Sequence, residues 1–320
     1  MTDFAELPNF WTPVVPSVEL GERPSAMQVA GQRIVLFRAE GAVHALMDVC
    51  PHRGVALSGG KVVRGCLQCP FHGWEFGGDG ACRHVPMNPE LDRGRLSATA
   101  LPVREIVGLI WVYTGFNPTT EPHIPEAFSR PGVQYAFLHE EWACHWTRAM
   151  ENMLDTPHLP FVHAGTIGRQ MKARLTDSSV LTQQITDTEQ GFSFSFQLDG
   201  HPPGRLRWAR PNNMELFISD TSTRFVRLHV WCIPTAPDRT LLLVGGCYDF
   251  GVFTSLLVAF NGVNRKVIFE DRAVVESSFP TRVPRPTEEK SVPTDKVTLR
   301  FRSWYFRHIV DGGGDEVAAE

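Results

Sequence analysis

The sequence predicts an α+β protein, in which an all-β N-terminal domain precedes a second domain that combines a β-sheet with helices. Short apolar segments separated by glycine turns occupy the first third of the chain, and longer alternating segments with two helical patterns follow a proline-rich stretch. The length of 320 residues also suggests two domains, because a domain has roughly 100–200 residues. A hydrophobic content of 42% excludes a disordered chain. The formal net charge of −4 gives no reason to expect a nucleic-acid partner.

The cysteines and the apolar stretches of the chain indicate a cytoplasmic protein without a membrane span. Seven cysteines are an odd number, and a chain of 320 residues does not need a disulfide framework. Residues 1–8 lack the basic and then apolar layout of a signal peptide. The most apolar stretch, residues 241–263, is interrupted by Asp249 and falls short of the about 20 apolar residues of a membrane helix. We therefore expect reduced thiols that are available for metals.

The N-terminal domain is predicted to span residues 1–116. Glycine-rich turns separate its predicted β segments, which include residues 31–38, 42–47 and 108–113. Residues 117–135 are rich in Pro, Asn, Thr and Glu, a composition that predicts a linker between the two domains.

The second domain is predicted to span residues 136–310. Residues 147–154 have a helix-forming composition, and Pro157 and Pro160 are expected to end or kink that helix. Alternating apolar and polar residues predict strands between residues 178 and 249, and a longer helix is expected over residues 253–277. The Gly-rich and acidic residues 311–320 are expected to form a mobile tail.

Two cysteine–histidine pairs form the first candidate metal site. Cys50 and His52 are two positions apart, and the pair of Cys69 and His72 follows after sixteen intervening residues. Two cysteines and two histidines suit a structural zinc ion or a Rieske [2Fe-2S] cluster, in which two histidines replace two cysteines on one iron. Zinc fingers of the helical type pair like residues with like, whereas each pair here mixes a thiol and an imidazole. The mixed pairs favour the cluster, with one iron held by the thiolates and the other by the imidazoles.

Other cysteines nearby offer competing patterns. Cys82 and His84 repeat the Cys-x-His spacing, but they follow the second mixed pair and so have the wrong order for two mixed loops. Cys66 and Cys69 form a Cys-x2-Cys pair that would suit a redox or zinc site. Structural packing is the expected role of Cys66 and Cys82.

The residues around the mixed pairs resemble the Rieske-type non-haem iron oxygenases. The similarity covers Cys-Pro-His-Arg at residues 50–53 and Gly-Cys-Leu-Gln-Cys-Pro-Phe-His-Gly-Trp-Glu-Phe at residues 65–76, with Gly80 and Cys82 after them. This resemblance implies that the two mixed pairs hold a [2Fe-2S] cluster. The same motif would fit a Rieske ferredoxin, which only carries electrons, so the rest of the chain decides whether the protein is an enzyme.

Two histidines, His158 and His163, begin the second candidate site, and a carboxylate farther along the chain is expected to complete it. Glu151, Asp155 and His158 are three or four residues apart, so a helix would place them on one side. His163 follows five residues after His158, and Pro160 allows the chain to bend this second histidine back to the same site. Two histidines and a carboxylate form the facial triad of non-haem Fe(II) oxygenases and leave positions open for O2. A structural pair of histidines is the alternative.

The third iron ligand is expected on the predicted helix over residues 253–277. Asp271 lies in a stripe of valines, where an unpaired carboxylate would be costly and a metal would remove that cost. Glu270 and Glu276 point away from the stripe and are expected in solvent. The resemblance agrees, because Asp271 matches the family's Asp that supplies the third iron ligand. The alternative is an Asp on the surface of a helix.

Asp155 is not counted among the iron ligands. It precedes His158 by one helical turn, so its carboxylate suits a residue that orients that imidazole. The resemblance implies more, because the family's corresponding Asp bridges a cluster histidine and an iron-bound histidine of neighbouring subunits in a ring-shaped trimer. By this likeness, His72 of one chain would meet Asp155 of the next chain in a homotrimer. An ordinary residue at a helix end is the alternative.

The resemblance implies a terminal oxygenase that takes electrons from a separate ferredoxin or flavin reductase. It would use O2 to hydroxylate or oxidatively demethylate a small apolar or aromatic molecule. No dinucleotide-binding fingerprint is apparent, so NAD(P)H would act only through the partner reductase. The chain looks most similar to the single-subunit monooxygenase and O-demethylase branch, with vanillate demethylase, dicamba monooxygenase and pheophorbide a oxygenase. The alternatives are a ring cis-dihydroxylase, an electron-transfer protein with a non-catalytic ligand-binding domain, and a zinc-stabilised binding module.

For the second domain, the resemblance implies a helix-grip antiparallel sheet with an apolar pocket beneath the iron. Several aromatic residues could line that pocket, although each of them also suits the plain core. These candidates are Phe192, Phe194, Phe217, Phe225, Trp231 and Phe253.

Overall fold

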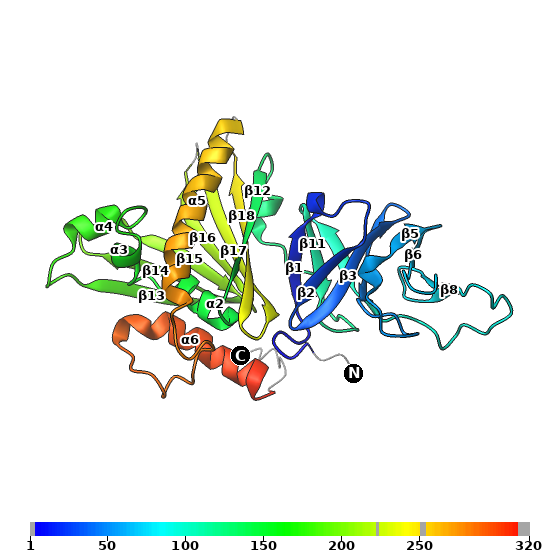
Figure 1. Cartoon of the computed structure of the whole chain (residues 1–320). Coiled ribbons are helices and arrows are strands. Elements are labelled where there is room, and N and C mark those ends of the chain that lie inside the picture. Colours follow the sequence, from blue (N-terminus) through cyan, green and yellow to red (C-terminus); the bar gives the residue numbers. More distant parts are fainter. Residues whose placement is uncertain (1–3, 222–223, 250–253, 313–320) are drawn as a thin grey trace. The chain divides into compact units, whose positions relative to one another are not determined.

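The computed structural model describes residues 4–221, 224–249 and 254–312, with side chains for all of these except residues 254–261. The chain divides into two compact units (Figure 1). The first unit comprises Met1–Ile124 with Ile233–Ala236, and the second comprises Pro125–Cys232 with Pro237–Glu320. None of the helices that the structure describes is both long enough and apolar enough to cross a membrane.

The first unit is built from three small antiparallel sheets. One sheet contains β1 (Trp11–Pro16), β11 (Leu109–Tyr113) and β10 (Val103–Ile106). The second contains β2 (Ser25–Val29), β3 (Gln32–Ala39), β4 (Ala42–Met47) and β9 (Ala100–Leu101). The third contains β5 (Lys61–Val63), β6 (Cys66–Gln68), β7 (Glu75–Phe76) and β8 (Cys82–His84), and short 3₁₀ helices cover Ser17–Glu19 and Leu57–Gly59. The expectation of an all-β N-terminal domain is confirmed.

A compact apolar core lies under the two loops that carry the cysteine–histidine pairs. Phe37, Leu67 and Phe76 are fully buried in one cluster, and this cluster also includes Cys50 and Cys69. Burial of such side chains contributes roughly 1.5–3 kcal/mol each, so the core anchors the base of both loops. The cysteines are therefore fixed from below, while the loop tips remain at the surface.

The second unit contains a seven-stranded antiparallel sheet. Its strands lie in the order β12-β18-β17-β16-β15-β14-β13. The six strands from β13 to β18 form a meander in chain order, and β12 pairs with β18 at the edge of the sheet. The bounds are β12 (Gln134–Trp142), β13 (Leu181–Thr188), β14 (Gly191–Leu198), β15 (Gly204–Ala209), β16 (Asn213–Asp220), β17 (Phe225–Ala236) and β18 (Arg239–Tyr248). This sheet confirms the antiparallel second domain that the sequence analysis expected.

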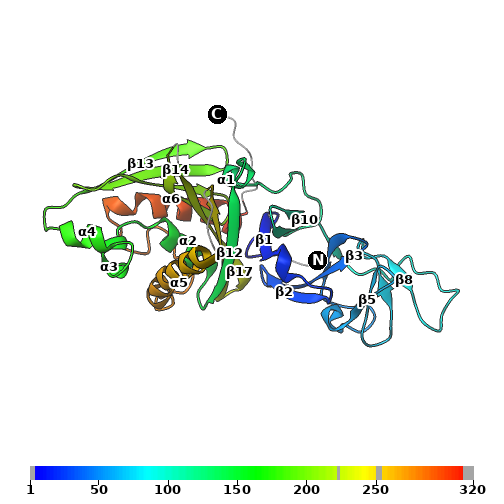
Figure 2. The same ribbon diagram turned by 90° about the horizontal axis from the view of Figure 1, so that it is seen from above.

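Helices of the second unit pack beside this sheet. They are α1 (Glu126–Ser129), α2 (Trp146–Leu154), α3 (Leu159–Val162), α4 (Arg169–Arg174), α5 (Thr254–Val275) and α6 (Lys296–Tyr305). A 3₁₀ turn at Pro293–Asp295 precedes α6, and a π-helical turn at Phe306–Val310 follows it. The helix α2 contacts α5, α6 and the strands β16 and β18, so it lies between the sheet and the two longer helices. Figure 2 shows α3 and α4 beside α5, with which α3 is in contact.

Two of these helices agree closely with the predicted segments. The helix α2 begins where His145 caps it through Nδ1, which accepts from the main-chain N–H of Thr147, and it ends before Asp155 turns to an extended conformation. Residues before a proline avoid the helical region, so the nearby Pro157 makes this end sharp. The helix α5 covers Thr254–Val275 of the predicted residues 253–277, whereas Phe253 lies outside the described residues. The predicted tail also lies largely outside them, from residue 313 onward.

The helix α6 is absent from the sequence-based prediction. Its buried residues Val297, Phe301, Trp304 and Tyr305 stand at i, i+4, i+7 and i+8, which is the spacing of an amphipathic helix. The periodicity was therefore available in the sequence. Trp304 and Phe301 pack against Trp208 of β15, with ring centroids 4.9 and 5.6 Å apart, so α6 covers the face of the sheet to which Trp208 points.

Candidate metal centres

The loop after β4 turns back tightly at Cys50. The N–H of Gly54 donates to the carbonyl of Cys50 at 2.8 Å, and the N–H of Cys50 donates to the carbonyl of Val55 at 2.8 Å. Gly54 has a φ of 71°, a left-handed conformation that favours glycine. The turn therefore presents the side chains of Cys50 and His52 from one short loop.

The loop after β6 repeats this geometry. The N–H of Gly73 donates to the carbonyl of Cys69 at 3.1 Å, and the N–H of Cys69 donates to the carbonyl of Trp74 at 2.8 Å. Gly73 also has a φ of 71°. Each loop thus offers one cysteine at its buried base and one histidine near its tip, as the mixed spacing in the sequence suggested.

The four side chains of these loops converge. The ring centroids of His52 and His72 are 4.6 Å apart, and the thiol of Cys69 lies close enough to the thiol of Cys50 to help raise its pKa. His52 Nδ1 is buried without a hydrogen-bond partner. Burial raises the pKa of the Cys50 thiol to about 11, so a thiolate there needs a metal to stabilise it. The orphaned imidazole nitrogen and the two buried, neighbouring thiols fit a [2Fe-2S] cluster.

The two histidines of this site differ in their aromatic neighbours and in their exposure to solvent. The indole of Trp74 stacks on His52 at 4.5 Å with an interplanar angle of 7°, and His52 is half-buried. His72 is exposed, and the ring of its neighbour Phe71 lies 3.9 Å away and is 60% exposed. The side of the loops that carries His72 therefore faces solvent in the isolated chain.

Trp74→Leu is expected to make the iron–sulfur centre less resistant to heat. The substitution removes a stacked ring worth about 1 kcal/mol, which corresponds to about 2–4 °C in a protein of this size. The visible absorbance of the cluster during a thermal ramp measures this difference. Trp74→Phe keeps an aromatic ring on His52 and serves as the control, and equal bleaching temperatures for the two variants would contradict the stacking argument.

The second candidate site begins where α2 ends. The helix ends at Leu154, where the predicted helix also ends, so the expectation that Glu151, Asp155 and His158 share one side of a helix does not hold. His158 instead precedes α3, and Pro160 occupies the first turn of that helix, where proline is tolerated. His163 directly follows α3, so the short helix brings both histidines to one place.

Asp271 of α5 completes this group. Its Oδ1 lies 3.1 Å from His163 Nε2 and 3.5 Å from His158 Nε2. One ligand atom from each of the three residues lies within 4.8 Å of the other two, and His163 and Asp271 are buried. Among the residues that the structure describes, no other group of three such side chains comes together in this way. Two imidazoles and one carboxylate are a donor set that suits Fe(II).

The electrostatics of this site favour a cation. Burial lowers the pKa of His163, but its hydrogen bonds with Asp271 and Glu270 outweigh burial and raise that pKa overall. The carboxylates therefore stabilise positive charge at this point. Iron(II) bound by the same atoms would take the place of that proton, which fits the donor set.

Glu270 lies at this site, although the sequence analysis expected it in solvent. Its Oε2 is 2.8 Å from His163 Nδ1 and accepts a hydrogen bond of 2.6 Å from the hydroxyl of Thr166. The expectation was wrong because it considered only the stripe of α5, whereas the turn after α3 folds against the flank of that helix. A carboxylate on the far nitrogen of a metal-binding histidine fixes the tautomer and the orientation of the ring.

Glu276 was also expected in solvent, and this expectation was wrong too. Its Oε1 accepts from the main-chain N–H of Ala143 at 2.7 Å and from Nε of Arg272 at 2.8 Å. It therefore connects α5 to the segment before α2, and it does not touch the histidines. Its position makes it a useful control for Glu270.

Glu270→Gln is expected to weaken iron binding at least tenfold, within the roughly 10–100-fold range for such supporting groups. The amide still accepts a hydrogen bond from His163, but it lacks the charge that raises the basicity of the imidazole. Iron retained after dialysis against graded chelator concentrations measures the effect. Glu276→Gln removes a carboxylate that directly follows the same helix, and a similar loss of iron in both variants would argue against a specific role of Glu270.

Asp155 lies beside His158 of this site. Its side chain is 40% exposed, and its Oδ1 is 3.9 Å from His158 Nδ1. Both atoms are buried, and neither has a hydrogen-bond partner. The two residues line a cavity of about 310 Å³ together with Glu151 and Asn152 of α2.

The aromatic residues that were considered for a substrate pocket do not share one surface. Directly paired residues lie on one face of a sheet, and the chain Phe192–Trp208–Met214–Val230 crosses four strands in this way. Trp231 follows Val230 and therefore points to the opposite face. On that face it packs with Phe128 of α1, at a centroid distance of 6.0 Å. Phe192 and Trp231 are buried core residues on different sides of the sheet.

Comparisons with known protein families match the two units separately. Residues 10–100 match the Rieske [2Fe-2S] domain, and residues 142–239 match the vanillate O-demethylase oxygenase C-terminal domain. Together these two matches cover more than half of the chain. The first contains both cysteine–histidine loops, and the second contains the two histidines of the other site.

Individual relatives support the same assignment over most of the chain. Methylxanthine N3-demethylase NdmB of Pseudomonas putida is 27% identical over 95% of this chain and 90% of its own length. Chlorophyllide a oxygenase of Chlamydomonas reinhardtii is 30% identical over 93% of this chain, which spans about half (48%) of that protein. Dicamba O-demethylase of Stenotrophomonas maltophilia is 34% identical over 49% of this chain and 47% of its own length.

Solved structures show the same architecture. NdmA of Pseudomonas putida superposes with a TM-score of 0.77 at 25% identity, over 94% of this chain and 89% of the other. Dicamba monooxygenase bound to dicamba has the same fold, with a TM-score of 0.79 at 22% identity over 97% and 98% of the two chains. Enzymes of this class carry a [2Fe-2S] cluster and a mononuclear iron, use O2, and receive electrons from a separate reductase or ferredoxin. The chain belongs to the Rieske-type non-haem iron oxygenases.

Proposed function

We propose that this chain is a terminal oxygenase that oxidatively demethylates a small aromatic or heteroaromatic molecule. The observation that carries the proposal is the convergence of two histidines and a buried carboxylate in a chain that also has both cysteine–histidine loops. The relatives NdmB and dicamba O-demethylase are named as demethylases, which favours this outcome over plain hydroxylation.

We assign the cofactor-holding residues from this geometry. Cys50, His52, Cys69 and His72 would hold the [2Fe-2S] cluster, and His158, His163 and Asp271 would hold the mononuclear iron. When bound, the cluster stores and passes single electrons, and the iron activates O2. The domain bounds that go with this assignment are 1–116 for the cluster domain, 117–135 for a linker, 136–310 for the catalytic domain and 311–320 for a tail.

The protein's own groups contribute orientation and exclusion of water. Both Nε2 atoms of the iron-site histidines point to Asp271, and Glu270 holds the ring of His163 from its other nitrogen. Burial of His163 and Asp271 keeps bulk water from that side of the site. Asp155 faces the remaining nitrogen of His158 and is the group through which this histidine would couple to an electron donor.

The donor to Asp155 is proposed to be the cluster of a neighbouring chain in a cytoplasmic homotrimer. His72 is exposed on the first unit, and Asp155 is partly exposed on the second, so both groups are accessible to another copy. Static light scattering of the purified protein tests this assembly, and a mass of about three times 35.8 kDa is expected. A monomer that retains full turnover would overturn the trimeric arrangement.

Ring cis-dihydroxylation is the second candidate reaction. It is favoured by 34% identity to the oxygenase subunit of 3-chlorobenzoate-3,4-dioxygenase of Comamonas testosteroni, over 49% of this chain. The product distinguishes the two reactions. A methyl group removed as formaldehyde leaves the ring intact, whereas dihydroxylation places two hydroxyl groups on adjacent ring carbons.

A substrate screen with a surrogate reductase tests the proposed function. Methoxy- and N-methyl-substituted aromatic compounds are supplied with NADH, and O2 uptake is compared with the formaldehyde and the demethylated product. One formaldehyde per O2 supports demethylation, and a cis-diol supports the second candidate. Protein that contains zinc in place of both iron centres would contradict every oxygenase assignment.

A further inference from the structure

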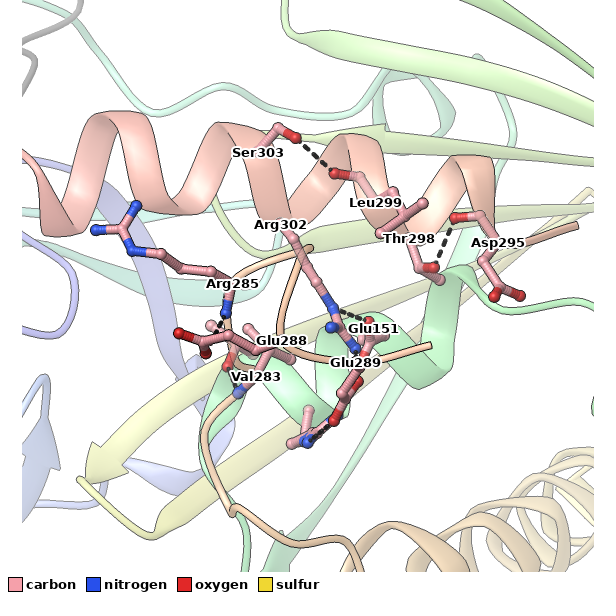
Figure 3. A network of polar contacts seen from close by, with 12 residues as sticks. Glu151, Val283, Arg285, Glu288, Glu289, Asp295, Thr298, Leu299, Arg302 and Ser303 are labelled. Atoms are coloured by element: carbon pink, nitrogen blue, oxygen red, sulfur yellow. Dashed lines mark hydrogen bonds and ion pairs between the residues drawn. The ribbon is translucent and has the colours of Figure 1, made fainter. Parts of the chain in front are cut away.

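Four charged side chains of the second unit form a closed ring next to Asp155. Arg148 donates to Glu151 at 3.2 Å and to Glu289 at 2.8 Å. Arg302 donates to the same two carboxylates, at 2.5 Å to Glu151 and at 2.6 Å to Glu289. Figure 3 shows Arg302 reaching from α6 to both glutamates. Positive and negative groups alternate around this ring, so each guanidinium is shared between two carboxylates.

The charged ring joins three separate segments of the chain. Arg148 and Glu151 belong to α2, Arg302 belongs to α6, and Glu289 lies in the segment between α5 and α6. Arg148 also donates from Nε and Nη2 to the carbonyl of Pro280, at 3.1 Å each. Both arginines are buried, so each of them depends on these partners.

Stability alone does not account for such a ring. Replacing a buried ion pair with well-packed apolar side chains is often neutral or stabilising, because removing two charges from water is costly. A planar guanidinium with two acceptors does, however, fix the directions of the groups around it. The specific contribution of the charged ring is therefore the fixed orientation of the last turn of α2 against α6.

Asp155 directly follows that last turn. The main-chain carbonyl of Glu151 accepts the N–H of Asp155 at 2.9 Å, so the residue held by two arginines also fixes the backbone of Asp155. The facing atoms Asp155 Oδ1 and His158 Nδ1 are 3.9 Å apart and have no other partner. A hydrogen bond between them requires about 3 Å, so a shift of about 1 Å decides whether the two groups couple. The charged ring, Asp155 and His158 all line the same cavity.

We propose that the charged ring of Arg148, Glu151, Arg302 and Glu289 is a positioning device that holds Asp155 within reach of His158. Its members are positioning residues, because they act through the backbone of Asp155. The inference rests on the proposed role of Asp155 between the two centres. It predicts that opening the ring slows the step that Asp155 mediates without displacing either metal centre.

Glu289→Gln opens the charged ring with almost no change in volume. Glu288→Gln is the matched control, because Glu288 is exposed, bonds only the main chain of Arg285 among the described contacts, and lies outside the ring. Protein reduced with dithionite is mixed with air-saturated buffer, with and without its mononuclear iron, and the iron-dependent oxidation of the cluster is followed by absorbance. We expect this oxidation to be about tenfold slower in Glu289→Gln and within about twofold of the parent in Glu288→Gln.

Hydrogen exchange at Asp155 provides a readout that does not depend on turnover. The amide of Asp155 is expected to exchange about tenfold faster in Glu289→Gln, because the turn that protects it is no longer held from α6. Iron and sulfide contents are expected to stay at the parent level. Unchanged exchange together with parent-like cluster oxidation would overturn the inference, and so would a loss of iron that accounts for the whole defect.

Two further variants separate the possible failures. Arg302→Lys keeps the positive charge but loses the planar fork of the guanidinium, so it tests the inference if Glu289→Gln does not fold. A rate of cluster oxidation between those of the parent and Asp155→Asn supports the inference. A parent-like rate overturns it. Asp155→Asn is measured alongside. If it oxidises like the parent, the proposed role of Asp155 fails, whereas a slow Asp155→Asn beside a fast Glu289→Gln overturns the ring inference alone.

Discussion

Asp155→Asn is expected to lower product formation by about a hundredfold or more, which corresponds to roughly 3 kcal/mol in the activation barrier. The substitution keeps the shape of the side chain and removes its charge. Asp155 neither binds the proposed iron nor belongs to the cysteine–histidine loops, so both metal centres are expected to stay in place. Its Oδ1 faces His158 Nδ1 at 3.9 Å, and an amide there is a poorer acceptor for the imidazole N–H.

The defect is expected in the transfer between the centres, and separate measurements can show this. Cluster reduction by the surrogate reductase and iron content should match the parent, while product formed per reduced cluster falls. Asp177→Asn changes an exposed Asp beyond α4 and serves as the control. Undiminished turnover in Asp155→Asn would remove this residue from the path between the centres.

The two cysteine–histidine loops could be predicted from the sequence because their information is local. Each loop holds a cysteine and a histidine within four positions, and the glycines that close the turns, Gly54 and Gly73, follow the histidine within two positions. A pattern of this kind can be recognised in the sequence without knowledge of the rest of the fold. The same holds for the two histidines around α3, which one short helix brings together.

Contacts between distant segments could not be predicted in this way. Glu270 is 107 positions from His163, and Arg302 is 151 positions from Glu151. The sequence shows only that Glu270 lies outside the apolar stripe of α5, which is also true of glutamates that are exposed to solvent. Its contact depends on how the turn after α3 packs against that helix. Asp271 could be predicted because a carboxylate within an apolar stripe is costly unless a partner such as a metal compensates its charge.

The fold shows the same division. Alternation in residues 191–197 predicts the strand β14, and the valine stripe predicts α5, since both are periodic within one element. The helix α6 also has a helical periodicity within its own sequence, whereas its packing depends on Trp208 of β15. The place of β12 at the edge beside β18 depends on pairing over about a hundred positions and has no local signal.

Asp271→Asn is expected to remove the mononuclear iron and to leave the cluster in place. The iron content should fall from about three to about two atoms per chain, because a [2Fe-2S] cluster accounts for two. Asp271 is buried and supplies the one carboxylate of the three-residue group, so a neutral amide in its place leaves only two imidazoles as strong ligands. We expect iron binding to weaken by about a thousandfold, roughly 4 kcal/mol, and product formation to disappear with it.

Metal analysis and spectra together test this expectation. The visible absorbance and the electron paramagnetic resonance signal of the reduced cluster should match the parent, because its proposed ligands lie in the other unit of the chain. Glu276→Gln, just after the end of the same helix, should keep all of its iron. Retention of the third iron by Asp271→Asn would mean that another carboxylate can take its place. Glu270 is the residue to test next, because its Oε2 already lies 2.8 Å from His163. A double variant at both positions would then have to lose the iron, since any further retention would place the metal outside this group of residues.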